Sequence, residues 1–594
     1  MKRILAVILS VCILCAMLSA CGASATSENS APAEAAASEP AEASSDEEAP
    51  ALAAEAPEAP AEAPAEAQEE PADVPAEDVE DQEEAVAYTP ISYPLDTDVS
   101  FSWFMSYPGV MEIFVESPFH DYEAWNEWMR RTGVTIDWYL VSGFETTIEQ
   151  FNLMLASGDY TDVFMSAMVS SATVDELVDQ GIIFDLKEQI PENMPDYMAY
   201  IDANEDFAAS IGSESAEGYW CGLHAYTENT YPSAGLVIRN DWLDEVNMEV
   251  PTTFDALHDV LTAFKSEIGA DDALWINYNG YIPDNGLISG FDTMGAADTN
   301  SYPFYQIDGE VMYGATNDGF REYIKTLSQW YSEGLVFRDF MSYTDSNTQA
   351  PSDLITNNRC GVYEQTLDSF HQYDDSSDTF EIVAMPNTRQ TDSQVLHFNG
   401  GRDGTSTDVL CVSTACENVE TVLQAFNYDF TEDGYLLMNY GIENDTFVFD
   451  ENGDPMLTDV VLKSELPDVS LALSVFTGTD ANAYSGIKDD GRGWALYDEA
   501  QQAACEVWSN EGDDKAYVFP SLCSMNLEES AAFNSKITDI STYVAEKTLS
   551  WIVGAADVEA DWDDYVANIG AMGIQDCIDA KQSSLDRYYE NLIS

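Results

Sequence analysis

The chain has 594 residues, and its 21 Lys and Arg residues stand against 109 Asp and Glu residues, a formal net charge of −88. So acidic a chain argues against nucleic-acid binding, because it has no basic surface to replace condensed counterions, and it disfavours a strongly anionic ligand. The length exceeds what one compact core usually supports, so we expect two or more lobes.

The N-terminus has the features of an export signal. Lys2 and Arg3 precede an apolar run over 4–18, which is shorter than a membrane span. The run ends in Leu18-Ser19-Ala20-Cys21, which resembles the bacterial lipobox and implies a signal peptide over 1–20 and a lipid on Cys21. An ordinary secretory signal with an incidental cysteine is the alternative.

A low-complexity segment follows. From Gly22 to about Ala87 the chain is almost entirely Ala, Glu, Pro and Ser, without Lys or Arg. Such a composition cannot bury enough apolar surface to offset its chain entropy. We therefore predict a disordered linker over 21–96 that holds the folded part away from the membrane.

Short strands and helices alternate in the next part of the chain. Strands are expected at 100–104, 134–138 and 162–165, with amphipathic helices between them. This alternation predicts α/β layers, with ligand-binding loops at the C-terminal ends of the strands.

The stretch from Gly218 to Phe254 organises the rest of the chain. It opens with an aromatic cluster, continues as a buried strand at 235–238, and enters a helix carrying Trp242. Asn240 or Asp241 is the expected N-cap of that helix. Beyond it we expect a strand at 273–276 and a helix at 320–333, whose apolar stripe is typical of a core.

Three stretches of the sequence carry a family resemblance: "GLVIRNDWL", "FNLMLASGDYTDVF" and "GIIFDLKEQIPENMPDY". From about Val99 to Tyr589 the chain resembles the family 1 extracellular solute-binding proteins of ABC importers, closest to a lipoprotein (LipO-like) subgroup. The resemblance implies an α/β, two-lobed type 2 periplasmic-binding-protein fold with an interlobe cleft. It also implies permease subunits and an ATPase as partners.

Lobe boundaries follow from the Pro- and Gly-rich breaks near Tyr231–Leu236 and Gln394–Arg402. We expect lobe I to comprise 97–234 and 396–430. Lobe II, with the closing helices, is expected to comprise 235–395 and 431–594.

Catalytic and metal-binding patterns find no support. HExxH, GxSxG and phosphate-binding loops are missing from the sequence, and the five histidines have no ligand spacing. The run Asp450 to Asp454 resembles a calcium loop, but its Gly comes too early and its twelfth position is Val461, so a hairpin turn is favoured. We expect no catalytic residue, no cofactor and no metal, and buried thiols for most of the cysteines.

Aromatic and short polar side chains near the expected cleft are candidates for ligand binding, because aromatic planes stack on sugar rings and polar groups bond sugar hydroxyls. Each aromatic residue is about as compatible with a core position. The candidates are Trp103, Tyr107, Ser166, Tyr219, Trp220, His224, Tyr226, Trp275, Tyr278, Asn399 and Arg402.

The expected function is capture of a small solute, preferably a neutral oligosaccharide, and its delivery to an ABC permease from the extracytoplasmic face of the cell membrane. The protein is expected to be a monomer, held to the membrane through its lipid alone. A short peptide is the alternative ligand, with Arg402 to hold its carboxylate. A surface interaction protein or an enzyme is the alternative outside transport.

Overall fold

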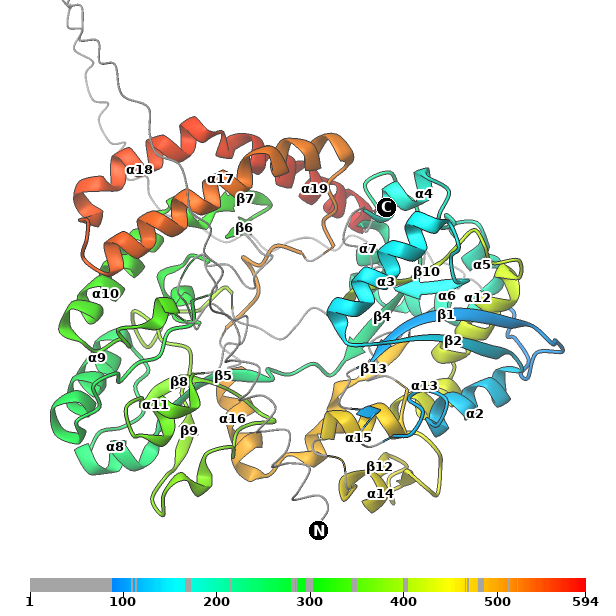
Figure 1. Cartoon of the computed structure of the whole chain (residues 1–594), viewed down its shortest axis with the longest axis horizontal. Helices are drawn as coiled ribbons and strands as arrows, with labels where there is room; N and C mark the ends of the chain where they lie inside the picture. Colours follow the sequence, from blue (N-terminus) through cyan, green and yellow to red (C-terminus); the bar gives the residue numbers. More distant parts are fainter. Residues whose placement is uncertain are drawn as a thin grey trace, which may run out of the picture. The chain divides into compact units, whose positions relative to one another are not determined.

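The protein is described from a computed structural model (Figure 1). The description covers residues 88–594 apart from 108–110, 113–114, 166–172, 214, 279–281, 283, 285, 295–302, 343–349, 399–403, 465, 467–468, 479–485, 510–512, 521 and 594. The predictions for the signal peptide, for Cys21 and for nearly all of the linker lie outside the described residues, as do those for Ser166, Asn399 and Arg402.

A six-stranded mixed sheet forms the first lobe, in the order β13-β4-β10-β3-β1-β2. Five strands run in the same direction and β10 alone runs against them, so the carboxyl ends of those five lie at one edge. The strands are β1 (Ser100–Tyr107), β2 (Thr135–Ser142), β3 (Val163–Met165), β4 (Leu223–Glu228), β10 (Thr405–Val412) and β13 (Ile487–Asp489).

Both faces of this sheet are buried, because successive apolar side chains of β1 point to opposite faces and each face needs a cover. Phe101, Trp103 and Met105 point into one core, whereas Phe104 points into the other. The helices of this lobe are α2 (Glu123–Thr132), α3 (Phe144–Ser157), α4 (Val174–Asp179), α5 (Gln189–Asn193), α6 (Pro195–Ala203), α7 (Glu205–Ser213), α12 (Val419–Asn427), α13 (Glu432–Tyr440), α14 (Asp459–Leu462) and α15 (Val469–Phe476). A separate hairpin consists of β11 (Phe447–Phe449) and β12 (Pro455–Leu457).

The second lobe has its own antiparallel sheet, in the order β8-β5-β9, and a core separate from that of the first. Its strands are β5 (Ala234–Arg239), β8 (Val362–Thr366) and β9 (Ile382–Ala384), with a hairpin of β6 (Phe304–Ile307) and β7 (Glu310–Tyr313). Its helices are α8 (Asn240–Val246), α9 (Phe254–Ala263), α10 (Asp318–Glu333), α11 (Ser352–Thr356), α16 (Glu499–Ser509), α17 (Leu527–Ile552), α18 (Val558–Met572) and α19 (Ile574–Ile593). The apolar stripe expected on α10 is buried, which confirms its assignment to the core. Over the residues described, none of the helices is both apolar and long enough to cross a bilayer.

The corner between β5 and α8 departs from the expected capping. Arg239 occupies the N-cap position and makes no side-chain cap. Asp241 instead accepts two hydrogen bonds from the buried Arg239, at 2.7 and 2.6 Å, and the guanidinium lies 4.4 Å from the ring centres of Trp242 and Phe380. A bidentate, charge-assisted pair outcompetes a single cap hydrogen bond for the carboxylate.

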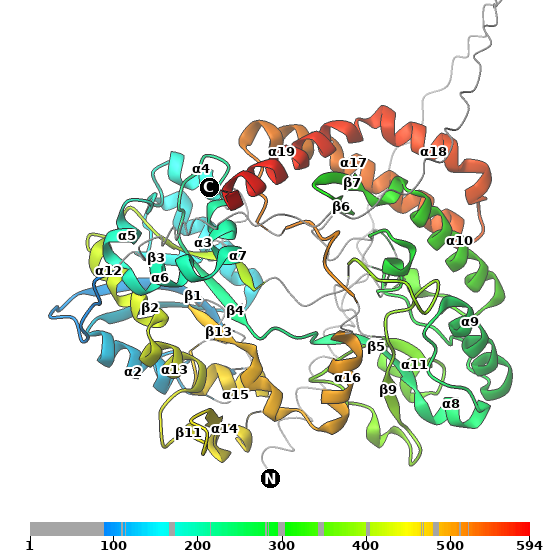
Figure 2. The same cartoon turned by 180° about the vertical axis from the view of Figure 1, so that it is seen from behind.

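The chain passes between the two sheets three times, where the sequence predicted two or more crossings. β4 leads into β5, a return pass leads into β10, and a third leaves β13 for α16 (Figures 1 and 2). Because of the third pass, the boundary between the lobes differs from the expected one. We expected all of 431–594 in the second lobe, whereas β13 and α13 pack with the first. A β-strand of three residues carries too little alternation to be recognised in a sequence.

A further contact joins the lobes through helices. α19, the last helix, packs against α7 of the first lobe, and Figures 1 and 2 both show the C-terminus beside α7 and α4.

Candidate functional site

All three passes meet at the carboxyl edge of the lobe I sheet. β4 ends there at Glu228 and β13 at Asp489, while β10 begins there at Thr405. Tyr226 is paired with Thr405 on one side and with Ile487 on the other, so the passes lie side by side. Ligands of open α/β sheets bind outside the carboxyl ends of the strands, so this edge is the candidate site.

Asp489 forms hydrogen bonds with residues of two of the passes. Its Oδ1 accepts hydrogen bonds from Asn229 Nδ2 at 2.8 Å and from the Gly491 backbone N–H at 2.9 Å. Its Oδ2 accepts from the hydroxyls of Tyr440 at 2.8 Å and Tyr435 at 3.1 Å, and burial raises the pKa of both tyrosines. The exits of β4 and β13 therefore share one buried carboxylate.

Aromatic rings line the outgoing passes. The ring of Tyr231 lies edge-on to Trp494 and Tyr497, at 5.9 and 6.0 Å between centres. A Cβ at Gly493 would lie 2.6 Å from the Tyr231 hydroxyl, so only glycine lets the ring approach so closely. Burial raises the pKa of Tyr231 to about 12, so its hydroxyl is neutral and can donate.

A second aromatic cluster lies at the return pass. His397 stacks on Tyr517 with 4.3 Å between ring centres, and Phe398 packs edge-on to Tyr305 and Tyr517. The Tyr517 backbone N–H donates to the His397 carbonyl at 3.1 Å, which fixes the two segments in register. Neither cluster was predicted as a site, although in each an aromatic residue stands beside a Gly-rich or crossing segment, a pattern that could have indicated it.

Lobe II presents Tyr278 and Glu364 near the end of its sheet from which the passes leave. Tyr278 follows a short segment that runs parallel to β8, and its ring lies 6.1 Å from Phe340. Burial, together with the smaller effect of the nearby charge of Asp284, raises the pKa of Glu364 to about 7. This part of lobe II therefore carries carboxyl groups and aromatic rings.

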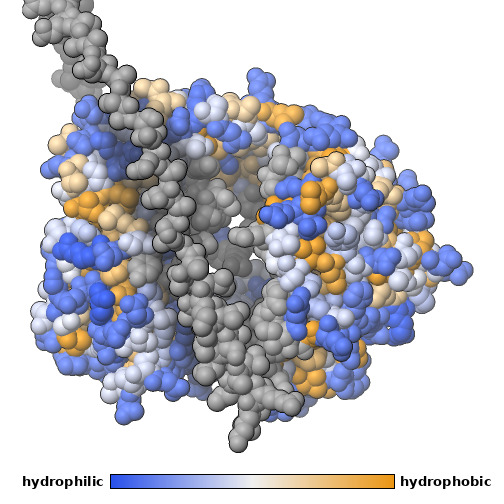
Figure 3. Space-filling model, viewed as in Figure 1, coloured by the Kyte–Doolittle hydropathy of each residue, from blue (hydrophilic) through white to orange (hydrophobic). Residues whose placement is uncertain are grey.

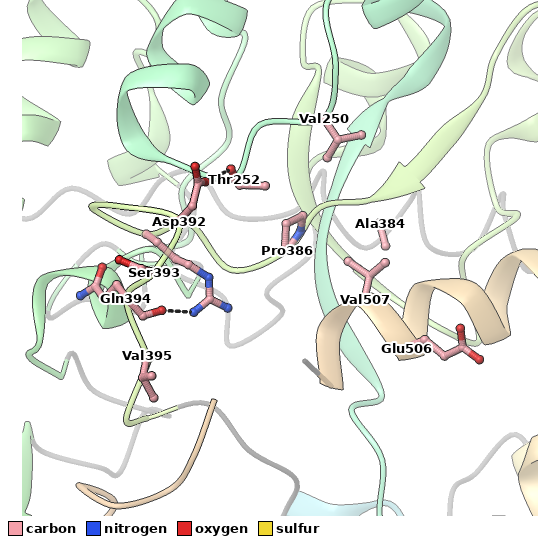
Figure 4. Close-up of a pocket in the computed structure, with 11 residues that line it drawn as sticks. Val250, Thr252, Ala384, Pro386, Asp392, Ser393, Gln394, Val395, Glu506 and Val507 are labelled. Carbon is pink, nitrogen blue, oxygen red and sulfur yellow. Dashed lines mark hydrogen bonds between the residues drawn. The ribbon is translucent and has the colours of Figure 1, made fainter. Parts of the chain in front are cut away.

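A pocket of about 730 Å³ lies on lobe II between the segment that follows β9, the end of α16 and the loop before α9 (Figure 4). Its lining is mixed, with Val250, Pro386 and Val507 as apolar members. Arg389 is held away from any ligand, because it donates to Asp513 at 2.6 and 2.7 Å and to the Gln394 carbonyl at 2.7 Å.

Four expected ligand residues are buried in the cores, among them Tyr278, which is 8% exposed in the core of lobe II. Trp103 is fully buried among Trp125, Trp138 and Phe426, Trp275 is 1% exposed and packs against Phe337, and His224 is fully buried in β4. These side chains offer little or no surface to a solute in this structure.

The other described candidates, Tyr107, Tyr219, Trp220 and Tyr226, are partly exposed. Tyr107 ends β1 at the candidate edge and donates to Glu112 at 2.7 Å. Tyr226 packs edge-on to Phe207 and Tyr200 beside the passes. Tyr219 and Trp220 precede β4, at the end of that strand farthest from the passes.

Metal ligands are not gathered anywhere in the described parts of the chain, where no group of three or more His, Cys, Asp or Glu side chains could hold an ion. Asp450 instead accepts the backbone N–H groups of Asn452 and Asp454 in the turn between β11 and β12, which confirms the expected hairpin. The seven cysteines described are buried free thiols.

No family model matches the chain. Among curated proteins, it is 23% identical over 491 residues to the fructooligosaccharide ABC transporter substrate-binding protein FusA of Streptococcus pneumoniae, covering 78% of this chain and 86% of FusA. It is also 23% identical to the polygalacturonan/rhamnogalacturonan-binding protein YtcQ of Bacillus subtilis, covering 62% and 74%, and to the lipoprotein LipO of the same organism, covering 41% and 49%.

Solved structures share the fold. The oligosaccharide (HMO)-binding solute-binding protein of Bifidobacterium longum infantis superposes with a TM-score of 0.64 at 20% identity, covering 83% of this chain and 99% of that one. The alginate-binding protein AlgQ2 superposes with a TM-score of 0.60 at 21% identity, covering 84% and 100%. The two-lobed fold and these relatives identify the chain as an extracellular solute-binding protein of an ABC importer.

Proposed function

We propose that the protein captures a neutral oligosaccharide at the carboxyl edge of the lobe I sheet, between the two lobes, and delivers it to an ABC permease. The observation that carries this proposal is the gathering of tyrosines at the edge from which all three passes leave. Tyrosine suits a sugar, because its ring stacks on the sugar face while its hydroxyl bonds the sugar hydroxyls.

The proposal that the ligand is neutral rests on the charges near the passes. Lys488 pairs with Asp490 at 3.3 Å, and Arg492 donates to the Asn439 carbonyl at 2.7 Å. Glu228 and Asp489 lie at the same edge. Lys488 and Arg492, the described cations named here, are already engaged by these contacts. A uronate would therefore bring its carboxylates against Glu228 and Asp489, and this repulsion disfavours anionic sugars of the kind named for YtcQ and AlgQ2.

Ligand must contact both lobes if it is to close them, because a ligand bound equally in the open and closed states shifts no equilibrium. We assign Tyr107 and Tyr226 to the lobe I side, and to the lobe II side the surface around Tyr278, whose own side chain is only 8% exposed. A lipid on Cys21 would hold the protein outside the cell membrane as a monomer, and an ATPase would complete the importer.

A thermal-shift screen of the purified protein tests the ligand class. The probes are kestose and nystose, trigalacturonate, and di- to hexapeptides. We expect the melting temperature to rise with a neutral oligosaccharide alone, since a ligand at a hundredfold its dissociation constant adds about 2.7 kcal/mol. The Tyr226→Ala variant should lose about 1–3 kcal/mol of binding free energy, with Tyr139→Ala, on the exposed edge strand, as control.

A shift with trigalacturonate or with peptides alone would contradict the proposed class. No shift with any probe would contradict solute capture from these three classes.

A further inference from the structure

The β11–β12 hairpin is apolar on both faces. Phe447 is 2% exposed, and its partner Leu457 packs on a small cluster of Val461, Ala472 and Leu473. On the other face Val448 lies opposite Met456, and these side chains are 41% and 45% exposed. Strands that are apolar on both faces are typical of strands covered on both sides, whereas the residues that the structure describes cover only one face here.

More apolar surface adjoins this face. Phe449 is 43% exposed, and in the following helix α14 Val460 and Leu462 are 42% and 41% exposed on either side of the buried Val461. Five of the exposed large hydrophobic side chains of the described residues thus fall within 448–462. Elsewhere, on the face seen in Figure 3, hydrophobic residues appear as separate patches among hydrophilic ones.

Carboxylates surround the apolar face. Glu451 and Asp454 are exposed in the turn of the hairpin, and Asp459 begins α14. Backbone hydrogen bonds from Asp454 and Asn452 lower the pKa of Asp450, so it too is ionised. Lys463 forms an ion pair with Asp459 at 2.8 Å. This contact does not neutralise the carboxylates of Asp450, Glu451 and Asp454.

We propose that the outer face of this hairpin, formed by Val448 and Met456, docks onto the permease. The complementary surface is an extracytoplasmic patch of apolar side chains ringed by Lys or Arg. This inference rests on the proposed delivery to a permease. It names the surface used.

Charge decides between the possible occupants of this face. A second copy of the chain carries the same acidic rim and a net charge of −88, so pairing would place carboxylate against carboxylate. An anionic membrane surface is disfavoured for the same reason. A basic rim on a protein partner removes the repulsion and adds attraction, while the apolar centre supplies the burial.

Site-specific photocrosslinking of the full-length protein in its own cells tests the proposal. Met456 is replaced by benzoylphenylalanine, and Leu153, which is 62% exposed on α3 of the same lobe, serves as the control position. We expect irradiation at 456 to give an adduct that mass spectrometry identifies as a polytopic ABC permease subunit, at least tenfold above the yield at 153. The double change Glu451→Lys with Asp454→Lys should reduce that yield at least tenfold without altering the melting temperature.

An adduct with a second copy, an adduct with lipid alone, or no protein adduct would overturn the proposal. So would an unchanged yield in the charge-reversal variant. The crosslink needs no solute, so its failure is distinguishable from failure of the oligosaccharide screen.

Discussion

Glu364 shows how one side chain couples the candidate site to pH. It lies in β8, two residues before the strand ends. Burial, and to a smaller extent the charge of Asp284, raise its pKa from 4.5 to about 7; Asp284 itself accepts a hydrogen bond from the Ile288 backbone N–H. Because the raised pKa favours the protonated folded state, this stabilisation is complete below about pH 4.5 and is lost as the pH rises through 7.

The Glu364→Gln variant should therefore melt at a higher temperature than the parent protein at pH 8 and at the same temperature near pH 4, because glutamine is neutral at both. Calorimetry across this range measures the difference. The exposed Glu443→Gln is the control, and it should follow the parent at every pH. A Glu364→Gln variant that ran parallel to the parent from pH 4 to 8 would contradict the assigned titration.

At the residue level, the sequence could predict where some candidates stand along the chain, and their role in binding stays a prediction. The sequence places Tyr107 after a strand and Tyr226 before a crossing; in the structure Tyr107 is the last residue of β1 and Tyr226 lies within β4, two residues before the strand ends. It could not separate Trp103 and Trp275 from cleft residues, because an aromatic residue in a strand points to either face and the pattern is the same in a core. Tyr231, Trp494 and Tyr497 approach one another from segments more than 260 residues apart, which no local pattern encodes.

At the scale of elements, α16 covers β5 through a single indole. Trp508 Nε1 donates to the Leu236 carbonyl at 2.9 Å, which lays the ring across Gly235. A Cβ at Gly235 would meet three ring atoms at 2.6 Å. The strand was predictable from its apolar run, but the need for glycine in it was not, because Trp508 lies 273 residues further along the chain.

Gly235→Ala should destabilise the protein by about 1–3 kcal/mol, as overpacking of a filled core does. Gly570→Ala in α18 is the matched control, since nothing lies within 4 Å of its Cβ, and it should gain about 0.5–1 kcal/mol from helix propensity. Urea unfolding compares the two. Equal stability of both variants would show that α16 does not pack rigidly on β5.

At the scale of the whole molecule, charge opposes compaction. The net charge of −88 produces self-repulsion that salt screens over a Debye length of about 10 Å at 0.1 M. The melting temperature should therefore rise between about 0.02 and about 0.3 M NaCl, and KCl at equal ionic strength should give the same rise. A fall, or a difference between the two salts, would indicate that specific ion pairs outweigh the general repulsion.

The three passes between the lobes also constrain how the chain can be made. The amino end is synthesised first, so the strands of lobe II, which end at Ala384, are complete before β10 and β13 of lobe I exist. The first-lobe sheet lacks its last edge strand until residue 489, and lobe II still awaits α16 to α19 at that point. Assembly therefore cannot follow the order of synthesis lobe by lobe. No single cut in the gene would yield a whole lobe, and the two halves must mature as one unit.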